Sequence, residues 1–275
     1  MLLLAIVTIS TILAGVIAFT LTPEYRVETV IAPVLEQSDL GPLGNIASQF
    51  GNLANLVGVG SNSGMDRNEL IAMLTSKEFA RDFIRTANLM PIMYADIWDP
   101  QEKKWLVSNP EEIPSEADAI KHFQEDILSV DEARRTTGLV TVAIQWRDRQ
   151  LAADWANSYV KFANDRISKR VIDEATKSRD YLETELAKTS VVELQQSIYG
   201  LIQAQINRIM LANVRKQYAF KVIDEAFVPD RDQFVKPRRV VIVCLGFLFG
   251  AFLGVCVVLL KAALPGIRTV LSNAA

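Results

Sequence analysis

The chain has 275 residues, half of them hydrophobic, and a formal net charge of −3 at pH 7. The hydrophobic excess lies in two uncharged stretches, one at each end, which leave a middle part of 218 residues, 22–239. This middle part carries 27 Lys and Arg against 32 Asp and Glu, because Lys261 and Arg268 are the only charged residues outside it. Its net charge of −5 argues against a nucleic-acid partner, and its lack of cysteine excludes disulfides and thiol chemistry there.

The first apolar stretch, 1–21, is long enough to cross a bilayer as a helix. A cleaved signal peptide is the alternative, but no basic region precedes the stretch and no A-x-A cleavage site precedes Pro23. Met1 already lies inside the apolar run. Because a spanning helix normally has polar residues outside it, the sequence leaves open whether a cytoplasmic tail precedes Met1.

The next part of the chain combines a strand, a loop and a helix. Residues 25–33 alternate between apolar and polar side chains, which predicts a half-buried strand. The glycine-rich segment 40–64 predicts a loop around a short helix. A phosphate-binding loop is disfavoured, because no GK[ST] sequence follows. Residues 66–88 predict one helix, with Asp66 and Glu69 as a capping box.

Two tryptophans, Trp98 and Trp105, lie in the turn-rich segment 90–114. We expect them to pin this segment onto the core, and stacking on a sugar ring is the alternative. A short helix is predicted for 115–123 and contains His122, the only histidine. Since no second histidine or cysteine lies nearby, we expect His122 to lie on the surface and not in a zinc or catalytic site.

A β-hairpin and a helical hairpin follow. Residues 127–134 and 139–146 predict two strands around Gly138, and the second is apolar on both faces, so it should be central in its sheet. Helical periodicity over 151–187 and again over 192–216 predicts two long antiparallel helices. The last third of the first helix is strongly charged, so we expect the hairpin to project from the body.

The turn of the helical hairpin carries Ser190 and Glu193, a second capping-box pattern. One partner helix could hardly cover the apolar residues of the return helix, which favours self-association. The expected contacts between copies are Ile198, Leu201, Ile202, Ile206 and Ile209. A last strand is predicted for 218–228. Since the first and last strands flank the two apolar stretches, we expect them to pair.

The second apolar stretch, 240–260, has 21 uncharged residues and is about 31 Å long as a helix. Gly246, Gly250 and Gly254 form a stripe on one face, where a second helix can approach closely. Pro237 predicts that this helix begins at Pro237 or Arg238.

No motif for catalysis or for a cofactor is evident. The sequence lacks a P-loop, HExxH, CxxC, GxSxG and a dinucleotide fingerprint, so we expect no enzyme, no metal and no cofactor. These observations leave open on which side of the membrane the middle part lies. The basic residues Lys236, Arg238 and Arg239 lie on the side of the middle part, but a domain of this size can be translocated regardless of charge.

At three places the sequence resembles the polysaccharide co-polymerases, the Wzz-type chain-length determinants of bacterial inner membranes. The first is an apolar stretch followed by Pro23-Glu-Tyr25 and a strand. The second is Arg147-Asp148 followed by Ala152, Ala153, Ala156, Asn157 and Tyr159. The third, and most specific, runs from Val222 to Pro229 and on through Lys236-Pro237-Arg238-Arg239 into a glycine-containing span. In it, Ala226, Pro229, Pro237 and Arg238 resemble the proline-rich signature of that family.

This resemblance implies an α+β fold in which two transmembrane helices flank a periplasmic domain with a small mixed sheet and a long helical hairpin. The implied parts are helix 1–21, periplasmic domain 22–239 with its hairpin at about 150–217, helix 240–260 and cytoplasmic tail 261–275. Both termini would be cytoplasmic. The implied role is to regulate, without catalysis, the length of a lipid-linked polysaccharide.

The implied partners are other copies in a homo-oligomeric ring, a Wzy-type polymerase, an undecaprenyl-linked glycan and the lipid bilayer. The polysaccharide would be O-antigen, capsule or exopolysaccharide. The fused tyrosine kinase found in one branch of the family is missing here. Two alternatives stay open. One is a two-span sensor, which would need an output segment beyond 261–275, and the other is an adaptor for a separate cytoplasmic tyrosine kinase in polysaccharide export.

Overall fold

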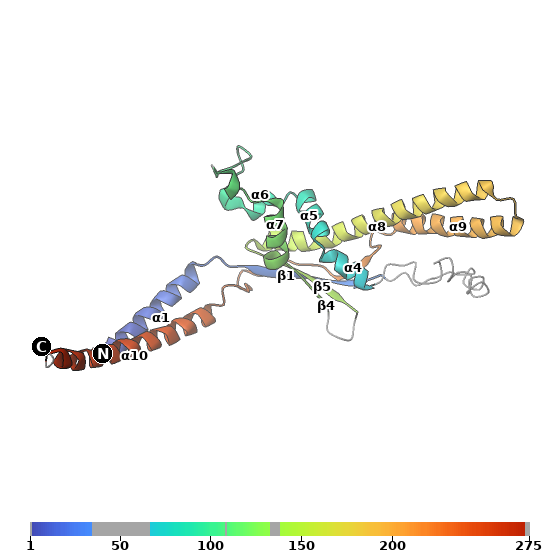
Figure 1. Ribbon diagram of the computed structural model, residues 1–275. Coiled ribbons are helices and arrows are strands. Elements are labelled where there is room, and N and C mark those ends of the chain that lie inside the picture. The colour runs from blue at the N-terminus through green and yellow to red at the C-terminus, as the bar shows by residue number, and fades with distance from the viewer. Residues whose placement is uncertain (1, 35–66, 108, 133–137, 273–275) are drawn as a thin grey trace. The chain divides into compact units, whose positions relative to one another are not determined.

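A computed structural model describes residues 2–34, 67–107, 109–132 and 138–272 (Figure 1). The predicted loop 40–64 and the predicted cap at Asp66 lie outside the described residues. The chain divides into two compact units. The larger unit comprises 27–145 and 153–228, and the smaller comprises 1–26, 146–152 and 229–275.

Most of a four-stranded sheet lies in the larger unit, with the strand order β4-β5-β1-β6. The strands are β1 (Tyr25–Pro33), β4 (Leu128–Glu132), β5 (Val140–Trp146) and β6 (Phe220–Asp224). β4 pairs with β5 and β1 pairs with β6, both antiparallel. Two expectations are thereby confirmed: the first and last strands pair with each other, and the strand that is apolar on both faces is an interior strand.

β1 buries one face, as its alternation predicted. Tyr25, Val27, Thr29 and Ile31 are buried, while Glu28 between them is exposed. The hydroxyl of Thr29 reaches the helix α8, described below. The strand β1 thus presents its apolar face to α8, and Figure 1 shows α5, α7 and α8 on the same side of the sheet.

The helix predicted over 66–88 is two helices, α4 (Arg67–Leu74) and α5 (Lys77–Thr86). The single-helix prediction was wrong because Ser76 interrupts the run with an extended backbone and caps α5. Its hydroxyl oxygen accepts a hydrogen bond from the Phe79 backbone N–H, 3.2 Å away. Serine favours such caps over helix interiors, since its side chain competes for backbone groups.

Short elements connect α5 to β4. They are α6 (Met90–Met93), a 3-10 turn (Ala95–Ile97), β2 (Trp98–Asp99), β3 (Lys104–Trp105), a second 3-10 turn (Pro110–Glu112), α7 (Glu116–His122) and a π-helical turn (Phe123–Ile127). Trp98 and Trp105 face each other across the β2–β3 ribbon, with ring centroids 4.9 Å apart. His122 lies 2.9 Å from Asp126 at a partly exposed site, which agrees with a surface position.

The core of the larger unit is centred on Tyr159 of α8, which is fully buried. The rings of Phe79 and Phe83 of α5 meet it edge-on, with centroids 5.2 Å and 4.9 Å away. The Tyr159 hydroxyl donates to the carbonyl of Leu74, at the end of α4. Such edge-to-face contacts add to the effect of burial. Tyr159 therefore joins α4 and α5 to α8.

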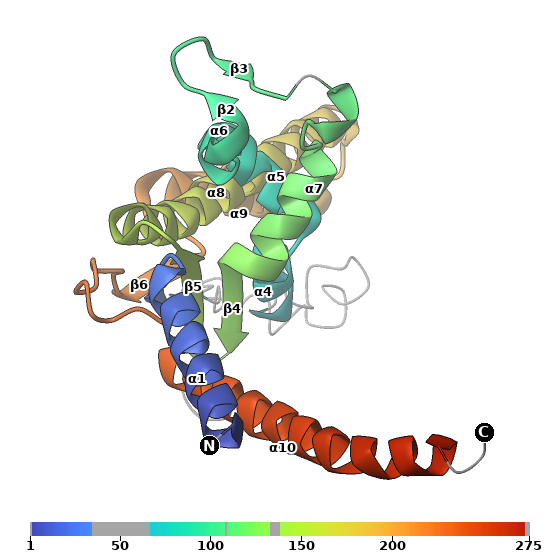
Figure 2. The same cartoon turned by 90° about the vertical axis from the view of Figure 1, so that its left-hand side faces the viewer.

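The helical hairpin consists of α8 (Arg149–Lys188) and α9 (Val192–Val214), which run side by side in Figures 1 and 2. The Ser168 hydroxyl donates to the Ala212 carbonyl, 2.6 Å away, and so joins the two helices. The reversal falls where it was predicted, but the Ser190 capping box was wrong. The N-cap residue of α9 is Val191, which makes no side-chain hydrogen bond to the helix. Ser190 lies one residue before this N-cap position.

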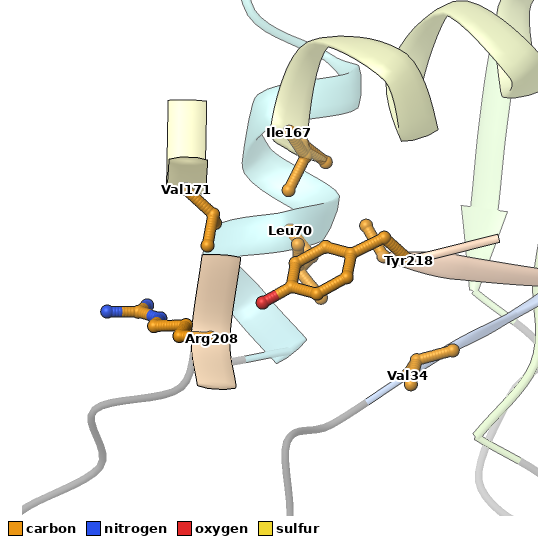
Figure 3. A pocket seen from close by; sticks show the side chains of 7 residues that line it. Val34, Leu70, Ile167, Val171, Arg208 and Tyr218 are labelled. Carbon is orange, nitrogen blue, oxygen red and sulfur yellow. The ribbon is translucent and has the colours of Figure 1, made fainter. Parts of the chain in front are cut away.

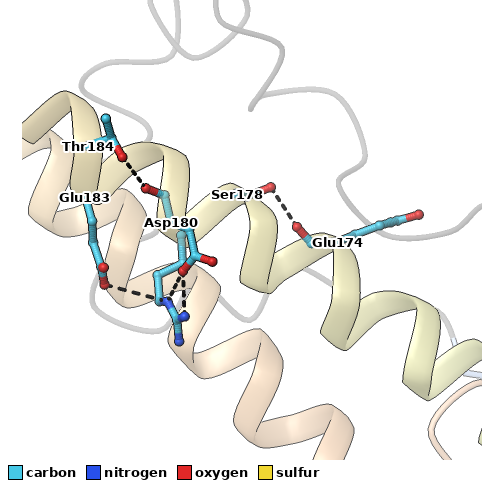
Figure 4. Close-up of polar contacts among 6 residues, drawn as sticks. Glu174, Ser178, Asp180, Glu183 and Thr184 are labelled. Atoms are coloured by element: carbon cyan, nitrogen blue, oxygen red, sulfur yellow. Dashed lines mark hydrogen bonds and ion pairs between the residues drawn. The ribbon is translucent and has the colours of Figure 1, made fainter.

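The outer part of α8 is charged, and the polar contacts drawn in Figure 4 are made within the helix. Arg179 pairs with Asp180 and, at 3.6 Å, with Glu183. The hydroxyls of Ser178 and Thr184 donate to carbonyls one turn earlier. These contacts agree with a solvated face.

In the smaller unit, α1 (Leu2–Thr20) packs along α10 (Arg239–Ser272). Among the described residues, one segment is long and apolar enough to cross a membrane, Arg239–Val257 of α10. The segment Val7–Thr20 of α1 is apolar but shorter. The helix α10 begins at Arg239, one residue after Arg238 and two after Pro237, the two predicted starts.

Candidate functional site

The three segments that carry the family resemblance meet through hydrogen bonds, beginning at the start of α8. The Asp148 carboxylate accepts from the backbone N–H groups of Gln150 and Leu151, at 2.8 Å and 3.0 Å. This is the geometry of a helix cap, which a carboxylate also stabilises by its charge. Asp148 therefore fixes where α8 begins.

Asn157 of α8 binds the backbone of Ala226. Its Nδ2 donates to the Ala226 carbonyl and its Oδ1 accepts from the Ala226 N–H, each at 2.9 Å. The same Oδ1 accepts from the Thr29 hydroxyl at 3.3 Å. An amide side chain has both a donor and an acceptor, so it can satisfy both polar groups of one residue. Asn157 thus joins β1, α8 and the residues after β6.

Asn164 acts in the same way seven residues further along α8. Its Oδ1 accepts from the N–H groups of Ala219 and Phe220 at 2.9 Å and 2.8 Å, and its Nδ2 donates to the Phe220 carbonyl at 3.0 Å. Seven residues are about two helical turns, so both asparagines lie on one face. With 3% of its surface exposed, Asn164 has its polar groups satisfied inside the core. We call Asn157 and Asn164 the asparagine clamp.

The proline-rich segment is held within the smaller unit. Arg149 Nη1 donates to the Pro229 carbonyl at 3.0 Å, and the Tyr25 hydroxyl donates to the Arg231 carbonyl at 3.2 Å. Pro229 and Pro237 are buried, whereas Arg238 is exposed. The Lys236–Pro237 peptide bond is cis.

Glu24 and Lys236 join the two places where the chain leaves and re-enters the helix pair. The Glu24 N–H donates to the Lys236 carbonyl at 2.9 Å, and the Val235 N–H donates to the Glu24 carbonyl at 2.8 Å. Their side chains form an ion pair at 3.3 Å. These contacts form a short β-bridge, which we call the neck.

The predicted glycine stripe faces α1. The Ser10 hydroxyl donates to the Gly246 carbonyl at 2.8 Å. A methyl group at Gly246 would overlap Ala14, and one at Gly250 would lie 2.7 Å from Ser10 Cβ and 3.1 Å from Val7 Cα. Gly254 is buried as well. Absence of side chains at these positions lets the two helix backbones approach closely.

The helix pair exposes its large apolar side chains and buries its small ones. Ala14 and Ala18 are buried, whereas Phe19, Leu248 and Phe252 are 60–70% exposed. In water this arrangement would be unfavourable, since it leaves apolar surface hydrated. In a bilayer the same side chains face hydrocarbon, so the pair suits a lipid environment.

The five predicted contact residues of α9 do not form one exposed surface. Ile198 and Ile202 are buried, and Leu201, Ile206 and Ile209 are half-buried. Other apolar side chains of α9 are exposed instead: Val192, Leu194, Tyr199, Met210, Leu211 and Val214. The apolar periodicity alone could not separate the side that meets α8 from the side that is left uncovered.

A small apolar pocket lies between α4, α8, α9 and the start of β6 (Figure 3). Its lining is Val34, Leu70, Ile167, Val171, Arg208, Tyr218 and Ala219, with Arg208 as the one charged member. No group of three or more potential metal ligands occurs among the described residues.

The shifted pKa values follow from burial and from local pairing. Burial raises the pKa of Tyr159. Hydrogen bonds from Ser115 lower the pKa of Asp118 in the α7 capping box, and hydrogen bonding to Glu116 raises the pKa of Arg85. The causes of these shifts are burial and contacts between neighbouring structural residues.

Several residues of this site were not predicted from the sequence. Asn164 and Arg149 carry no motif of their own, and Glu24, although part of Pro23-Glu-Tyr25, gave no sign of its pairing with Lys236. The small residues Ser10, Ala14 and Ala18 were a usable signal, because they repeat every four residues opposite the glycine stripe. Such matched four-residue spacing in two apolar stretches is typical of paired membrane helices.

The fold and the site define an α+β body whose last strand leads, through a segment with two buried prolines, into an apolar helix that can cross a membrane. Residues 183–263 match the family described as the G-rich domain on putative tyrosine kinase. This region runs from the end of α8 through α9, β6 and the proline segment into α10. The match supports the resemblance to the Wzz-type chain-length determinants.

Two solved structures are similar to the chain. One is a full-length bacterial polysaccharide co-polymerase, with 13% identity over 95% of this chain and 94% of that chain and a TM-score of 0.42. The other is a fragment of WzzB, the polysaccharide co-polymerase from Salmonella Typhimurium, with 11% identity over 76% of this chain and 97% of that chain and a TM-score of 0.34. No curated protein matches the chain.

Proposed function

We propose that this protein is a non-catalytic, homo-oligomeric scaffold of the bacterial inner membrane that regulates the length of a lipid-linked surface polysaccharide made by a Wzy-type polymerase. The observation that carries the proposal is the family match over 183–263. It covers the block from Val222 to Arg239 on which the sequence resemblance is most specific. The clamp ties that block to a second resembling segment, since Asn157 binds Ala226.

In this proposal α1 and α10 are both transmembrane helices, residues 22–239 are periplasmic, and both termini are cytoplasmic. The exposed apolar surface of the helix pair supports insertion of both helices. The orientation can be tested by labelling. Cys244 and Cys256 both lie in α10, so a Lys177→Cys variant places a single new thiol on exposed α8. A membrane-impermeant maleimide should label it in intact spheroplasts. Labelling only after lysis would place 22–239 in the cytoplasm.

Chain-length control is tested by deleting the gene and separating the surface polysaccharide by size. We expect loss of a modal length distribution while polymerisation continues, and its return with the wild-type gene. The same deletion in a strain without the polymerase should have no effect on length. Polysaccharide of unchanged distribution in the deletion strain would contradict the proposal.

Self-association is tested by native mass spectrometry of the protein in nanodiscs. A single large homo-oligomer is expected, with other copies of the chain, the polymerase and the undecaprenyl-linked glycan as partners. A monomer or dimer in lipid would contradict a ring scaffold.

A second candidate is an adaptor for a separate cytoplasmic tyrosine kinase in polysaccharide export. The description of the matched family, which places this domain on putative tyrosine kinases, favours it. The two candidates differ in one observation: an adaptor should co-purify with kinase activity from membranes, and a co-polymerase should alter glycan length without one.

A further inference from the structure

A guanidinium group is held between two aromatic rings where α10 begins. Arg239 Cζ lies 4.4 Å from the ring centroid of Phe234 and 4.7 Å from that of Phe19. Phe19 belongs to the last turn of α1, and Phe234 belongs to the proline-rich segment. The two cation–π contacts fix the guanidinium from both the helix pair and the segment leading to it.

The guanidinium of Arg239 has donors but no acceptor among the described residues. Its Nε is buried and has no hydrogen-bond partner. The aromatic rings attract the charge, but they leave the buried Nε–H without a hydrogen-bond partner. Arg239 as a whole is only half-buried and forms no ion pair with the described residues, so an anion from outside the chain would stabilise its charge.

The surroundings indicate what that acceptor is. Phe19 is 70% exposed and Val240, the next residue of α10, is 77% exposed. Both belong to the apolar surface that suits hydrocarbon. A ligand here must offer an anion to Arg239 and apolar chains to its neighbours. Phosphate matches the planar fork of arginine, and a lipid carries both features in one molecule.

Neighbouring charges distinguish Arg239 from the other basic residues. Lys236 is paired with Glu24 at 3.3 Å. Arg238 is exposed and forms none of the aromatic contacts found for Arg239. The fourth basic residue of the segment, Arg231, lies between Asp230 and Asp232, so its charge is offset locally.

We infer that Arg239, held between Phe19 and Phe234, binds the phosphate of an anionic lipid at the bilayer surface. The inference requires both helices to lie in the membrane, as proposed above, but it does not depend on chain-length control. It assigns to this chain a lipid-binding site at the end of the helix pair.

The test measures lipid retained on the full chain by native mass spectrometry, with phosphatidylglycerol and phosphatidylcholine as probes. Arg239→Gln should weaken retention of phosphatidylglycerol about tenfold, which corresponds to the loss of one charge-assisted hydrogen-bonding group. Arg238→Gln is the matched control, because it removes the same charge one residue away, and it should stay within about twofold of the wild type. Phe234→Leu, which keeps the charge, should weaken retention partially.

Equal losses in Arg239→Gln and Arg238→Gln would overturn the site in favour of diffuse charge attraction, and so would no loss in Arg239→Gln. Displacement of the lipid by excess inorganic phosphate would show a free-anion site and overturn the lipid assignment. Carbonate extraction of the same membranes separates the two proposals. If the wild-type protein is extracted, the membrane topology fails and this inference fails with it. If the protein resists extraction but the lipid-retention result fails, the membrane topology stands and only the lipid-binding site is wrong.

Discussion

The hydroxyl of Ser10 donates a hydrogen bond to the backbone carbonyl of Gly246, 236 residues further along the chain. A helical side chain covers the turn that precedes it, so the absence of a side chain at Gly250 leaves the carbonyl of Gly246 accessible to Ser10. Ala14 and Ser10 then occupy the space that side chains at Gly246 and Gly250 would need. The glycine stripe therefore has a partner within the same chain.

Gly250→Leu should separate the two helices. Even a methyl group there would lie 2.7 Å from Ser10 Cβ, so a leucine must push α1 away, at a cost of about 1–3 kcal/mol. The measurement is disulfide crosslinking between cysteines introduced in α1 and α10, together with the glycan length distribution. Phe249→Leu is the control, because Phe249 is 61% exposed on the outer face. Unchanged crosslinking and unchanged glycan length in Gly250→Leu would sink this prediction.

Ser10→Ala should loosen the same contact more gently. It removes one hydrogen bond between helices, which in membrane proteins contributes about 0.6 kcal/mol. Thr11→Ala also removes a hydroxyl, but that hydroxyl bonds to Val7 within α1. We therefore expect a lower thermal unfolding midpoint in detergent for Ser10→Ala than for Thr11→Ala. The reverse order would contradict the role given to Ser10.

Asn157→Ala should destabilise the larger unit. It leaves both polar groups of buried Ala226 without their partner, at a cost of about 1–3 kcal/mol for each group that stays dry. Asn213→Ala is the matched control, since Asn213 bonds only within α9 at an exposed position. Urea unfolding of the full chain, monitored by circular dichroism, gives the free energy of unfolding of each variant. A similar loss in the two variants would show that the clamp has no special role.

Tyr159 predicts how stability depends on alkaline pH. Burial raises its pKa in the folded state above the value of about 10 in the unfolded chain. The stability it contributes is thus fully present below pH of about 10, and it falls as pH rises further, because the unfolded state loses the proton first. Tyr159→Phe should be less stable at pH 7, where the bond to Leu74 is missing, yet its stability should fall less steeply above pH of about 10. An unchanged slope in alkaline unfolding would contradict this.

Much of the fold was predictable because its signals are local. The alternation in β1, the apolar character of β5 and the periodicity of α8 and α9 each reflect burial of one element against a neighbour. The break at Ser76 was missed because the apolar spacing continues across it. A single serine side chain decides that break by bonding to Phe79 N–H.

The site was harder to predict, because it depends on long-range pairs. Asn157 was recognised within a motif, but nothing in the sequence showed that it binds Ala226, 69 residues away. Asn164 was missed for the same reason. Whether a half-apolar helix such as α9 buries Ile202 or Tyr199 depends on its rotation about its own axis relative to α8. The apolar periodicity does not determine this rotation.

The exposure of apolar side chains on one side of α9 leads to a prediction about how copies of the chain assemble. Tyr199 and Met210 are about 60% exposed, whereas Ile198 and Ile202 are buried, so contacts between copies should involve the first pair. Met210→Asp should therefore reduce the mass of the oligomer in nanodiscs. Ser197→Asp, which adds the same charge at an exposed polar position of α9, should not. A loss of assembly with Ser197→Asp alone would place the contact elsewhere.

The neck at Glu24 and Lys236 makes the chain modular. The segment from Tyr25 to Val235 is flanked by Glu24 and Lys236, whose backbones are hydrogen-bonded to each other. Such a segment can be exchanged as a cassette without altering the distance that the helix pair must span. Chimaeras joined at the neck could then assign length control either to the cassette or to the helix pair.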